Sequence, residues 1–421
     1  MRAGSPGLRR CVTGAVCRHV CGYTHRMRVL IVGAGIAGPS LAFWLLRQGM
    51  QVTLVEKAPR LRTGGYIIDF WGAGYDIAER MGLLPELQGI GYRVTDVRMV
   101  GRDGRRVSGF PADALGRMTG GRYMSLARGD LAACIYRQVA ADVETLFGDS
   151  VTKIEDKGST VHVTFEQSAA RDFDLVIGAD GLHSSVRRLV FGEQSRFEKY
   201  LGYKVAAFEV SGYRPRDEDV YVLHTQVGQQ VGRFSMRDDR TMFLFVFRDA
   251  ESDAHPGDMA AQKALIRRRY AHSAWECPQI LAALDQTQSL YFDRVSQVHM
   301  PRWSQGRVAL LGDAAACASL LAGQGSALAM VEAYILAGEL KTAGGDPARA
   351  FAAYERRLMP FLAMKQKAAA RFAGSFAPSS ALGLFLRNQI MKAFTIPWIA
   401  ELALGSDLRD KFDLPAYDAK S

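Results

Sequence analysis

Glycine and carboxylate residues occur together at several places in the chain, and such pairs can hold a nucleotide through backbone N–H groups and hydroxyl contacts. The first place is the segment GAGIAG, which contains Gly33, Gly35 and Gly38 and is followed by Glu56. Gly33 permits a tight turn, Gly35 lets the backbone approach a pyrophosphate, and Gly38 lets a helix pack on a strand. Glu56 can accept hydrogen bonds from ribose hydroxyls and would repel a 2′-phosphate. The segment therefore predicts a site for the ADP half of FAD or NAD.

The elements around this segment have the order that the motif requires. Residues 28–32 read as an apolar strand, a helical pattern follows the glycines, and residues 51–55 make a second strand that ends at Glu56. This strand–turn–helix–strand context favours nucleotide binding over a glycine-rich turn that only connects two elements. Ala37 in the turn and Lys57 after Glu56 are further candidate cofactor contacts.

Two later strands also end in glycine and an acid. Residues 174–177 run into Gly178-Ala-Asp180-Gly181, and residues 307–311 run into Gly312-Asp313. Because the carboxyl ends of parallel strands meet at one edge of a sheet, we expect Glu56, Asp180 and Asp313 to lie at one edge.

The cofactor can be chosen from the last of these segments. Gly312 allows close approach and Asp313 can accept protons from a polyol, while the turn Gly323-Gln-Gly325-Ser326 opens a helix. The N-terminus of that helix would stabilise the negative charge of a reduced flavin. An NAD dehydrogenase needs neither feature, so the set favours FAD.

These motifs together resemble the class A flavoprotein monooxygenases, which have the para-hydroxybenzoate hydroxylase-like fold. The resemblance covers residues 28–364. Within the family, the chain is most similar to the tetracycline-inactivating monooxygenases and related polyketide hydroxylases, and this similarity is carried by the stretches RTGGYIIDFWG, SLARGDL, DLVIGADGLHSSVR and GRVALLGDAAACASLLAGQGSALAMVEAYILAGEL. It implies FAD as cofactor, NAD(P)H as a transient co-substrate, and O2 activation as a flavin C4a-hydroperoxide. The implied reaction is hydroxylation of an aromatic or polycyclic, polyketide-like and possibly tetracycline-like small molecule.

The resemblance also implies a role for each matched residue. The residues that would bind the ADP half are Gly33, Gly35, Gly38 and Glu56, and Arg128 would reach the phosphate or ribityl region. Asp180 would lie beside the pyrophosphate and the NAD(P)H approach, and Gly312 and Asp313 would hold the ribityl chain. The isoalloxazine edge would be lined by Gly323, Gly325 and Ser326, and the loop flanking the flavin would contain Gly65 and Asp69.

Some alternatives stay open for these residues. Arg128 could be a solvated residue at a helix start capped by Asp130, and Gly65 and Asp69 could belong to a plain loop. The family often has prolines between the Gly-Asp pair and the next glycine turn, whereas this chain has none there.

The region after residue 200 predicts the substrate half. Residues 204–210, 220–226, 231–236 and 241–247 read as strands, and Phe243, Phe245 and Phe247 alternate onto one face. That face could line a cavity, but a sheet core is favoured. We assign no catalytic residue, because His224 and Arg233 are guesses that more often describe solvent-facing strand positions.

The expected fold class is α/β: a Rossmann-like FAD-binding domain with an inserted antiparallel β-sheet substrate domain and C-terminal helices. The FAD-binding domain is expected over residues 27–93, 124–199 and 300–370, and the substrate domain over 94–123 and 200–299. Residues 371–421 would form a helical segment that caps the cavity, forms a dimer face or touches a membrane surface, with capping favoured. Residues 1–26 are expected to be a disordered or mis-annotated extension, with a transit peptide as the alternative.

Composition bounds the remaining classes. The net charge is +10, but residues 1–26 contribute five arginines and no acid, so the body is not basic enough to indicate nucleic-acid binding. Cysteine and histidine spacing predicts no metal site and no disulfide framework, which fits a reducing compartment, and we expect a cytoplasmic protein. A monomer or homodimer is expected. The apolar run over 314–338 contains Gly323, Gly325 and Glu332 and predicts a buried loop and helix, with no transmembrane segment. Rival functions are a flavin-dependent reductase, a halogenase (its WxWxIP signature is absent) or a non-catalytic flavin-binding module.

Overall fold

The computed structural model describes residues 26–61, 65–112, 116, 119–250, 258–394 and 412–417. The expectations for the N-terminal extension and for most of the chain after residue 394 therefore lie outside the described residues.

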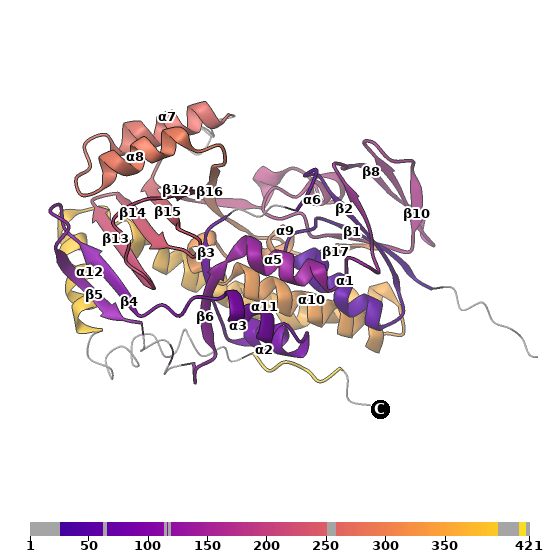
Figure 1. Cartoon of the computed structure of the whole chain (residues 1–421). Coiled ribbons are helices and arrows are strands. Elements are labelled where there is room, and N and C mark those ends of the chain that lie inside the picture. The colour runs from indigo at the N-terminus through magenta and orange to yellow at the C-terminus, as the bar shows by residue number, and fades with distance from the viewer. Residues whose placement is uncertain are drawn as a thin grey trace, which may run out of the picture.

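A six-stranded sheet forms one end of the molecule (Figure 1). Its order is β17-β18-β11-β1-β2-β7, and every neighbouring pair is parallel except β17–β18. Its central strands β1, β11 and β18 are short apolar runs without polar alternation, as expected for a parallel sheet covered on both faces. Their bounds are β1 (Arg28–Val32), β2 (Gln51–Glu56), β7 (Glu144–Phe147), β11 (Leu175–Gly178), β17 (Ser304–Gln305) and β18 (Val308–Leu310).

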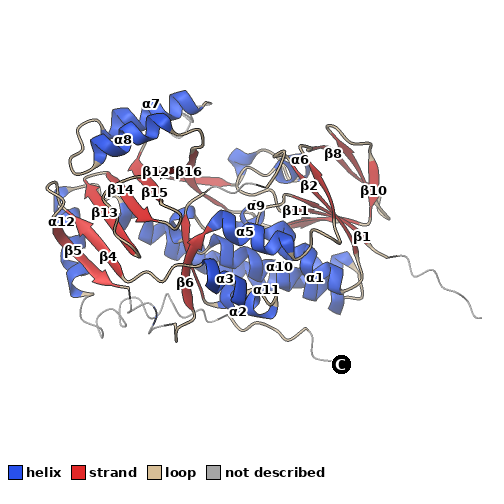
Figure 2. Cartoon of the chain, in the orientation of Figure 1, coloured by secondary structure: helices blue, strands red, loops and turns tan. Residues whose placement is uncertain are grey.

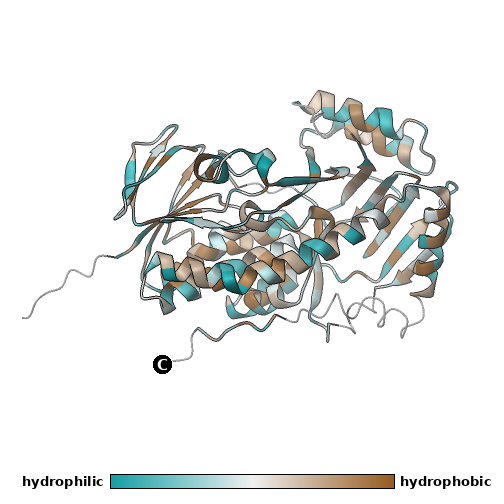
Figure 3. Ribbon diagram, turned by 180° about the vertical axis from the view of Figure 1, so that it is seen from behind, coloured by the Kyte–Doolittle hydropathy of each residue, from teal (hydrophilic) through white to brown (hydrophobic). Residues whose placement is uncertain are grey.

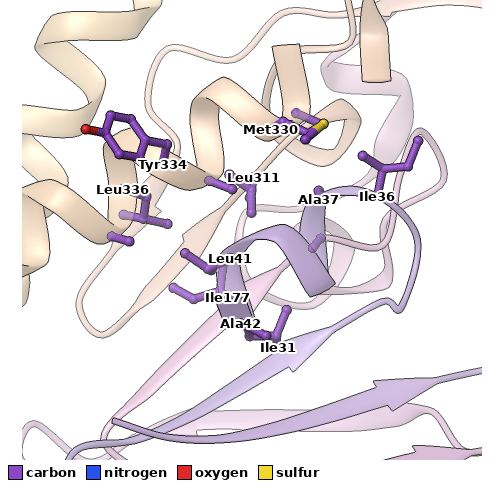
Figure 4. Packing of buried hydrophobic residues seen from close by; sticks show 14 of the residues in the cluster. Ile31, Ile36, Ala37, Leu41, Ala42, Ile177, Leu311, Met330, Tyr334 and Leu336 are labelled. Carbon is purple, nitrogen blue, oxygen red and sulfur yellow. The ribbon is translucent and has the colours of Figure 1, made fainter. Parts of the chain in front are cut away.

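Helices cover this sheet, and one of them is buried almost throughout. α10 (Gly325–Thr342) packs against α1 (Ala37–Arg47), α2 (Ala73–Arg80) and α11 (Pro347–Phe376). Figure 4 shows apolar side chains of the strands, α1 and α10 gathered in one layer. The apolar run over 314–338 is thus a core helix and its preceding loop, as predicted. No helix among the described residues is long and apolar enough to cross a membrane.

The other described helices have between 4 and 13 residues. They are α3 (Leu84–Ile90), α5 (Arg128–Arg137), α6 (Ser185–Val190), α7 (Met259–Tyr270), α8 (Cys277–Gln286), α9 (Asp313–Ala316) and α12 (Ala381–Ala393), with the 3-10 turns η1 (Gln194–Arg196) and η2 (Leu320–Ala322). α12 packs on the edge strand β5. Figure 3 shows the molecule from behind, where hydrophilic and hydrophobic residues are mixed along the surface helices.

A seven-stranded sheet stands at the other end of the molecule (Figure 2). Its order is β16-β12-β15-β14-β13-β4-β5, and it is antiparallel except for the parallel pair β13–β4. Its strands are β4 (Asp96–Val100), β5 (Arg106–Pro111), β12 (Glu198–Ser211), β13 (Val220–Gln226), β14 (Gln229–Ser235), β15 (Arg240–Arg248) and β16 (Tyr291–Val298). One face packs under α7 and α8, where Phe243, Phe245 and Phe247 are buried in one apolar cluster and the last two contact Tyr270. The sheet-core interpretation of these phenylalanines is therefore confirmed.

A pair of strands connects the two sheets. β3 (Ile67–Trp71) and β6 (Tyr123–Ala127) are antiparallel, and a single bridge joins Ser125 to Tyr92 just before β4. A separate three-stranded sheet contains β8 (Val151–Asp156), β9 (Val161–Phe165) and β10 (Arg171–Phe173). The α/β fold class is as predicted, while the exact domain limits stay a prediction.

Candidate cofactor site

The three predicted strand ends meet at one edge of the six-stranded sheet. In the parallel register, Val32 lies level with Gly178 and with Val55, and Gly178 lies level with Leu310. The acids that follow these positions, Glu56, Asp180 and Asp313, therefore leave the sheet on the same side. The expectation that the three acids lie at one edge of the sheet is confirmed, and their role in a binding site stays a prediction.

Two glycines of the first turn, Gly33 and Gly38, are packed so closely that they cannot carry side chains. Gly33 has φ 109°, and a Cβ there would lie 2.5 Å from the carbonyl oxygen of Ala179. A Cβ at Gly38 would lie 2.0 Å from the carbonyl oxygen of Gly33. A Cβ at Gly35 would meet no atom within 4 Å, so open space adjoins this part of the turn. The turn thus offers backbone at the N-terminus of α1 to a close-lying ligand.

Glu56 braces the same turn. Its carboxylate accepts hydrogen bonds from the N–H groups of Ala34 and Ala58, each at 2.9 Å. Each carboxylate oxygen has more than one acceptor direction, so ribose hydroxyls can still donate to it. Lys57, by contrast, is exposed beyond the end of β2.

The Asp180 carboxylate accepts hydrogen bonds from the loop that follows it. One oxygen accepts from the Ser184 hydroxyl at 2.5 Å, and the other accepts from the N–H groups of Ser185 and Val186 and from the Ser185 hydroxyl. These bonds fix the start of α6. The structure thus gives Asp180 a local structural task, and its contact with a cofactor stays a prediction.

Asp313 lies among residues of the other motifs. A Cβ on Gly325 would be 3.7 Å from its carboxylate, and Gly312 lies against Ala37 of α1, so the Gly312-Asp313 motif touches both the turn before α10 and the first motif. Burial raises the pKa of Asp313, and the positive charge of Arg128 partly opposes that rise. Among the described residues, no ion pair joins Arg128 to Asp313 or to any other acid. The side-chain hydrogen-bond partner of the Asp313 carboxylate is the Cys317 thiol.

Arg128 and Gly65 are neighbours, as the resemblance requires. The Arg128 N–H donates to the carbonyl oxygen of Tyr66 at 3.1 Å, and a Cβ on Gly65 would lie 3.6 Å from that of Arg128. Arg128 is the first residue of α5, with Ala127 in the capping position. The alternative with Asp130 as the cap is wrong, because β6 runs directly into the helix two residues earlier.

Several residues of this site escaped the sequence analysis. The Tyr66 and Tyr291 rings lie 5.5 Å apart, and Arg128, Asp293 and Asp313 act electrostatically on both tyrosines. Burial raises the pKa of Tyr66 to about 12, so this phenol is neutral. Tyr66 follows Gly65 and could have been suspected from that position. Tyr291 and Asp293 come from β16, and no local pattern marks them.

Asp69 lies in β3, so the plain-loop alternative is wrong for this residue. Its carboxylate accepts hydrogen bonds from the hydroxyls of Ser125 at 2.6 Å, Tyr123 at 2.7 Å and Tyr221 at 3.4 Å. Burial raises the pKa of Asp69, while these hydroxyl donors lower it. Asp69 also lines a small pocket with Gln324, which stands between Gly323 and Gly325. Asp69 and the turn before α10 are thus neighbours, and Ser326 is buried in the first turn of that helix.

The expectation of solvent exposure for His224 and Arg233 is wrong. Each is 3% exposed on the face of the sheet that α8 covers. Arg233 pairs with Asp217 at 2.6 Å and Glu276 at 3.2 Å, and His224 contacts the carbonyl oxygen of Val100. Neither side chain lies among the strand-end residues.

The arrangement fits FAD. An open glycine turn at a helix N-terminus suits a pyrophosphate, Glu56 suits a ribose, and Asp313 suits the hydroxyls of a ribityl chain. Arg128 provides a positive charge close by, and the turn before α10 provides a second helix N-terminus. Among the described residues, no cluster could hold a metal ion.

Comparisons with known proteins agree with this geometry. The model of the FAD binding domain family matches residues 125–361, and that of the FAD dependent oxidoreductase family matches residues 28–66. The chain is 43% identical over 343 residues to the uncharacterized protein Rv1260 of Mycobacterium tuberculosis, covering 80% of this chain and 91% of that protein. It is 35% identical to a flavin-dependent monooxygenase from an unidentified prokaryote, covering 81% of this chain and 88% of that protein. The crystal structure of tetracycline destructase Tet(51) superposes with a TM-score of 0.80 at 31% identity, over 93% of this chain and 100% of that one.

Proposed function

The chain belongs to the FAD binding domain family as a class A flavin-dependent monooxygenase, and from that premise we propose that it hydroxylates a polycyclic aromatic or polyketide-like substrate. NAD(P)H is the proposed electron donor and O2 the oxygen source. A tetracycline-like molecule is the first substrate to test, because the tetracycline destructase is alike in fold over nearly the whole chain.

One observation carries the proposal: the cofactor edge and the seven-stranded sheet meet at Tyr66 and Tyr291. Tyr66 precedes β3 on the cofactor side, and Tyr291 begins β16 of the sheet. A substrate held against this end of the sheet would lie beside Arg128 and Asp313, where the cofactor is expected. Oxygen transfer requires this closeness, because the reacting atoms must be held in contact.

FAD, when bound, supplies the electron transfer from NAD(P)H and the activation of O2. The protein's own residues bind and orient. Asp313 would accept protons from ribityl hydroxyls, Arg128 would balance negative charge, and the tyrosine rings would exclude water from the reacting face. No side chain is assigned as a catalytic acid or base. This fits chemistry in which the cofactor performs the bond-making step.

The first experiment tests the reaction class. The purified protein is reduced anaerobically with NADH and, separately, with NADPH, and then mixed with O2 in the presence and absence of substrate. Substrate-stimulated consumption of reductant and O2, with one oxygen atom added to the product, is the expected result. A flavin that is reduced and reoxidised with no oxygenated product from any substrate would contradict the hydroxylase proposal and favour a reductase.

The second experiment tests the substrate class. The protein is incubated with NAD(P)H and a panel of tetracyclines, aromatic polyketides and simple phenols, and products are scored by mass spectrometry. We expect turnover of polycyclic compounds in preference to simple phenols. Preference for a simple phenol would refute the polycyclic assignment and leave the monooxygenase class intact. Cytoplasmic location and a monomeric or homodimeric state remain predictions.

A further inference from the structure

The three strand ends differ in how their carboxylates are used. Glu56 accepts two backbone N–H groups of its own turn, and Asp180 accepts backbone and hydroxyl donors of its own loop. Asp313, at the third strand end, receives no backbone N–H donor among the described residues, and its side-chain hydrogen-bond partner is the Cys317 thiol. At this strand end a carboxylate from another element accepts the backbone N–H.

That group is Glu332, in the second turn of α10. Its carboxylate accepts the N–H of Gly312 at 2.7 Å and lies 3.3 Å from the hydroxyl of Tyr354 on α11. Glu332 is 2% exposed, so its carboxyl does not reach solvent. Its hydrogen bond to the strand-end residues is the one from the Gly312 N–H, and the charge of Asp313 also acts on it.

Gly312 needs this support because its backbone conformation is unusual. It has φ 65° and ψ −141°, a region that residues with a Cβ rarely adopt, and it directly precedes Asp313. A Cβ at this position would also lie 3.2 Å from that of Ala37. The orientation of the Gly312 peptide therefore decides where the Asp313 side chain starts.

We propose that Glu332 is a positioning residue for the cofactor: by holding the Gly312 N–H, it fixes the turn and leaves the Asp313 carboxylate free for FAD. These different roles explain why the two acids Glu332 and Asp313 are both buried in this region. Glu332 accepts the backbone N–H of Gly312, and Asp313 would contact the ligand. The inference depends on FAD binding and is independent of the substrate proposed above, so failed hydroxylation assays would not affect it.

The charge state of Glu332 gives this role a second signature. Burial raises the pKa of Glu332 to about 8, the Gly312 N–H lowers it, and the charge of Asp313 raises it. Besides Asp313, the titratable group that faces the Glu332 carboxyl is Tyr354. α1 and α2 also pack on α10, but no charged side chain of their described residues acts on the Glu332 carboxyl. An anionic cofactor nearby favours the neutral form, so FAD affinity should fall as pH rises through the pKa of Glu332.

The test compares four apo-proteins by titration with FAD, followed through quenching of flavin fluorescence. Glu332→Ala removes the acceptor, Glu332→Gln keeps an acceptor without the charge, and Glu339→Ala is the control. Glu339 is also buried on α10, but its partners are Tyr417 and Arg357. Circular dichroism of each apo-protein checks the fold.

We expect Glu332→Ala to weaken FAD binding by about tenfold or more, equivalent to about 1.4 kcal/mol, because a backbone N–H loses its buried partner. Glu332→Gln and Glu339→Ala should stay near the wild-type affinity at about pH 7. Between about pH 7 and pH 9 the wild type should lose affinity, and Glu332→Gln should lose much less.

Two results would overturn the proposal. One is equal FAD affinity in Glu332→Ala and Glu332→Gln; the other is equal weakening in Glu332→Ala and Glu339→Ala, which would indicate only helix packing. If Glu332→Ala does not fold, the pH comparison decides alone. A parallel loss of affinity in the wild type and Glu332→Gln would then refute the role of Glu332.

Discussion

The rings of Tyr66 and Tyr291 lie 5.5 Å apart, at an interplanar angle of 54°, where the cofactor strands meet the seven-stranded sheet. Tyr66 is tied to the cofactor motifs through the backbone N–H of Arg128, and Tyr291 pairs with Ala207 inside the sheet. This contact joins the element that would hold the cofactor to the element that would hold the substrate. Changes on either side of it should therefore have different consequences.

Gly33 and Gly35 should respond differently to alanine. Gly33→Ala places a Cβ 2.5 Å from the carbonyl oxygen of Ala179 at a positive φ, so we expect a less stable apo-protein by about 1–3 kcal/mol. Gly35→Ala meets no protein atom, so the apo-protein should stay within about 0.5 kcal/mol of the wild type. FAD binding should be weakened in both. Urea unfolding of the apo-proteins and FAD titration measure the two effects, and normal FAD affinity in Gly35→Ala would show that the cofactor does not approach this turn.

Loss of the Arg128 charge should weaken the cofactor site without unfolding the protein. We expect Arg128→Met to reduce FAD affinity by about tenfold, or about 1.4 kcal/mol. The substitution removes the positive charge next to Asp313 that would balance the negative charge of the cofactor. Arg137→Met is the control, since Arg137 is on the same helix and pairs with the surface residue Glu86. Equal FAD affinity in the two variants would count against a cofactor contact by Arg128.

Asp69 should make the stability of the apo-protein depend on pH. Burial raises the pKa of Asp69 above its ordinary value of 3.8, so the folded state holds this proton more tightly than the unfolded state. Stability should therefore fall as pH rises from 3.8 through the raised pKa, and the loss persists at higher pH. Asp69→Asn should flatten this part of the profile, as measured by urea unfolding at a series of pH values. An unchanged profile would place the titration elsewhere.

The phenylalanines of β15 should support the fold and leave the cofactor site alone. Phe245 is 1% exposed beneath α7, so Phe245→Ala should cost about 3–5 kcal/mol of unfolding free energy. Phe385 on α12 is 57% exposed, and Phe385→Ala should change stability by no more than about 0.5 kcal/mol. Denaturant unfolding measures both variants. In folded Phe245→Ala, FAD affinity at low temperature should match the wild type, and a large loss would indicate that this face contributes to the site.

Local sequence determined the strand ends and their glycine turns. A turn such as that at Gly33 depends on residues close in the chain, so composition and spacing predict it well. That β18, β11, β1 and β2 present their carboxyl ends at one edge follows from the same reasoning, whereas their order in the sheet came from the structure. The general fold class, the FAD cofactor and the buried helix over the apolar run were predictable on these grounds.

Only the tertiary structure decided which acids serve the backbone and which face a ligand. Asp180 and Asp313 follow similar strand ends, yet the Asp180 carboxylate accepts hydrogen bonds from its own loop. At the other strand end, Glu332 from a separate helix accepts the backbone N–H of Gly312 in place of Asp313. Likewise, Tyr291 reaches Tyr66 only because β16 is placed by the packing of a whole sheet, and Arg233 is buried because α8 covers it. Such contacts depend on the summed packing of distant elements, and no pattern of neighbouring residues records that sum.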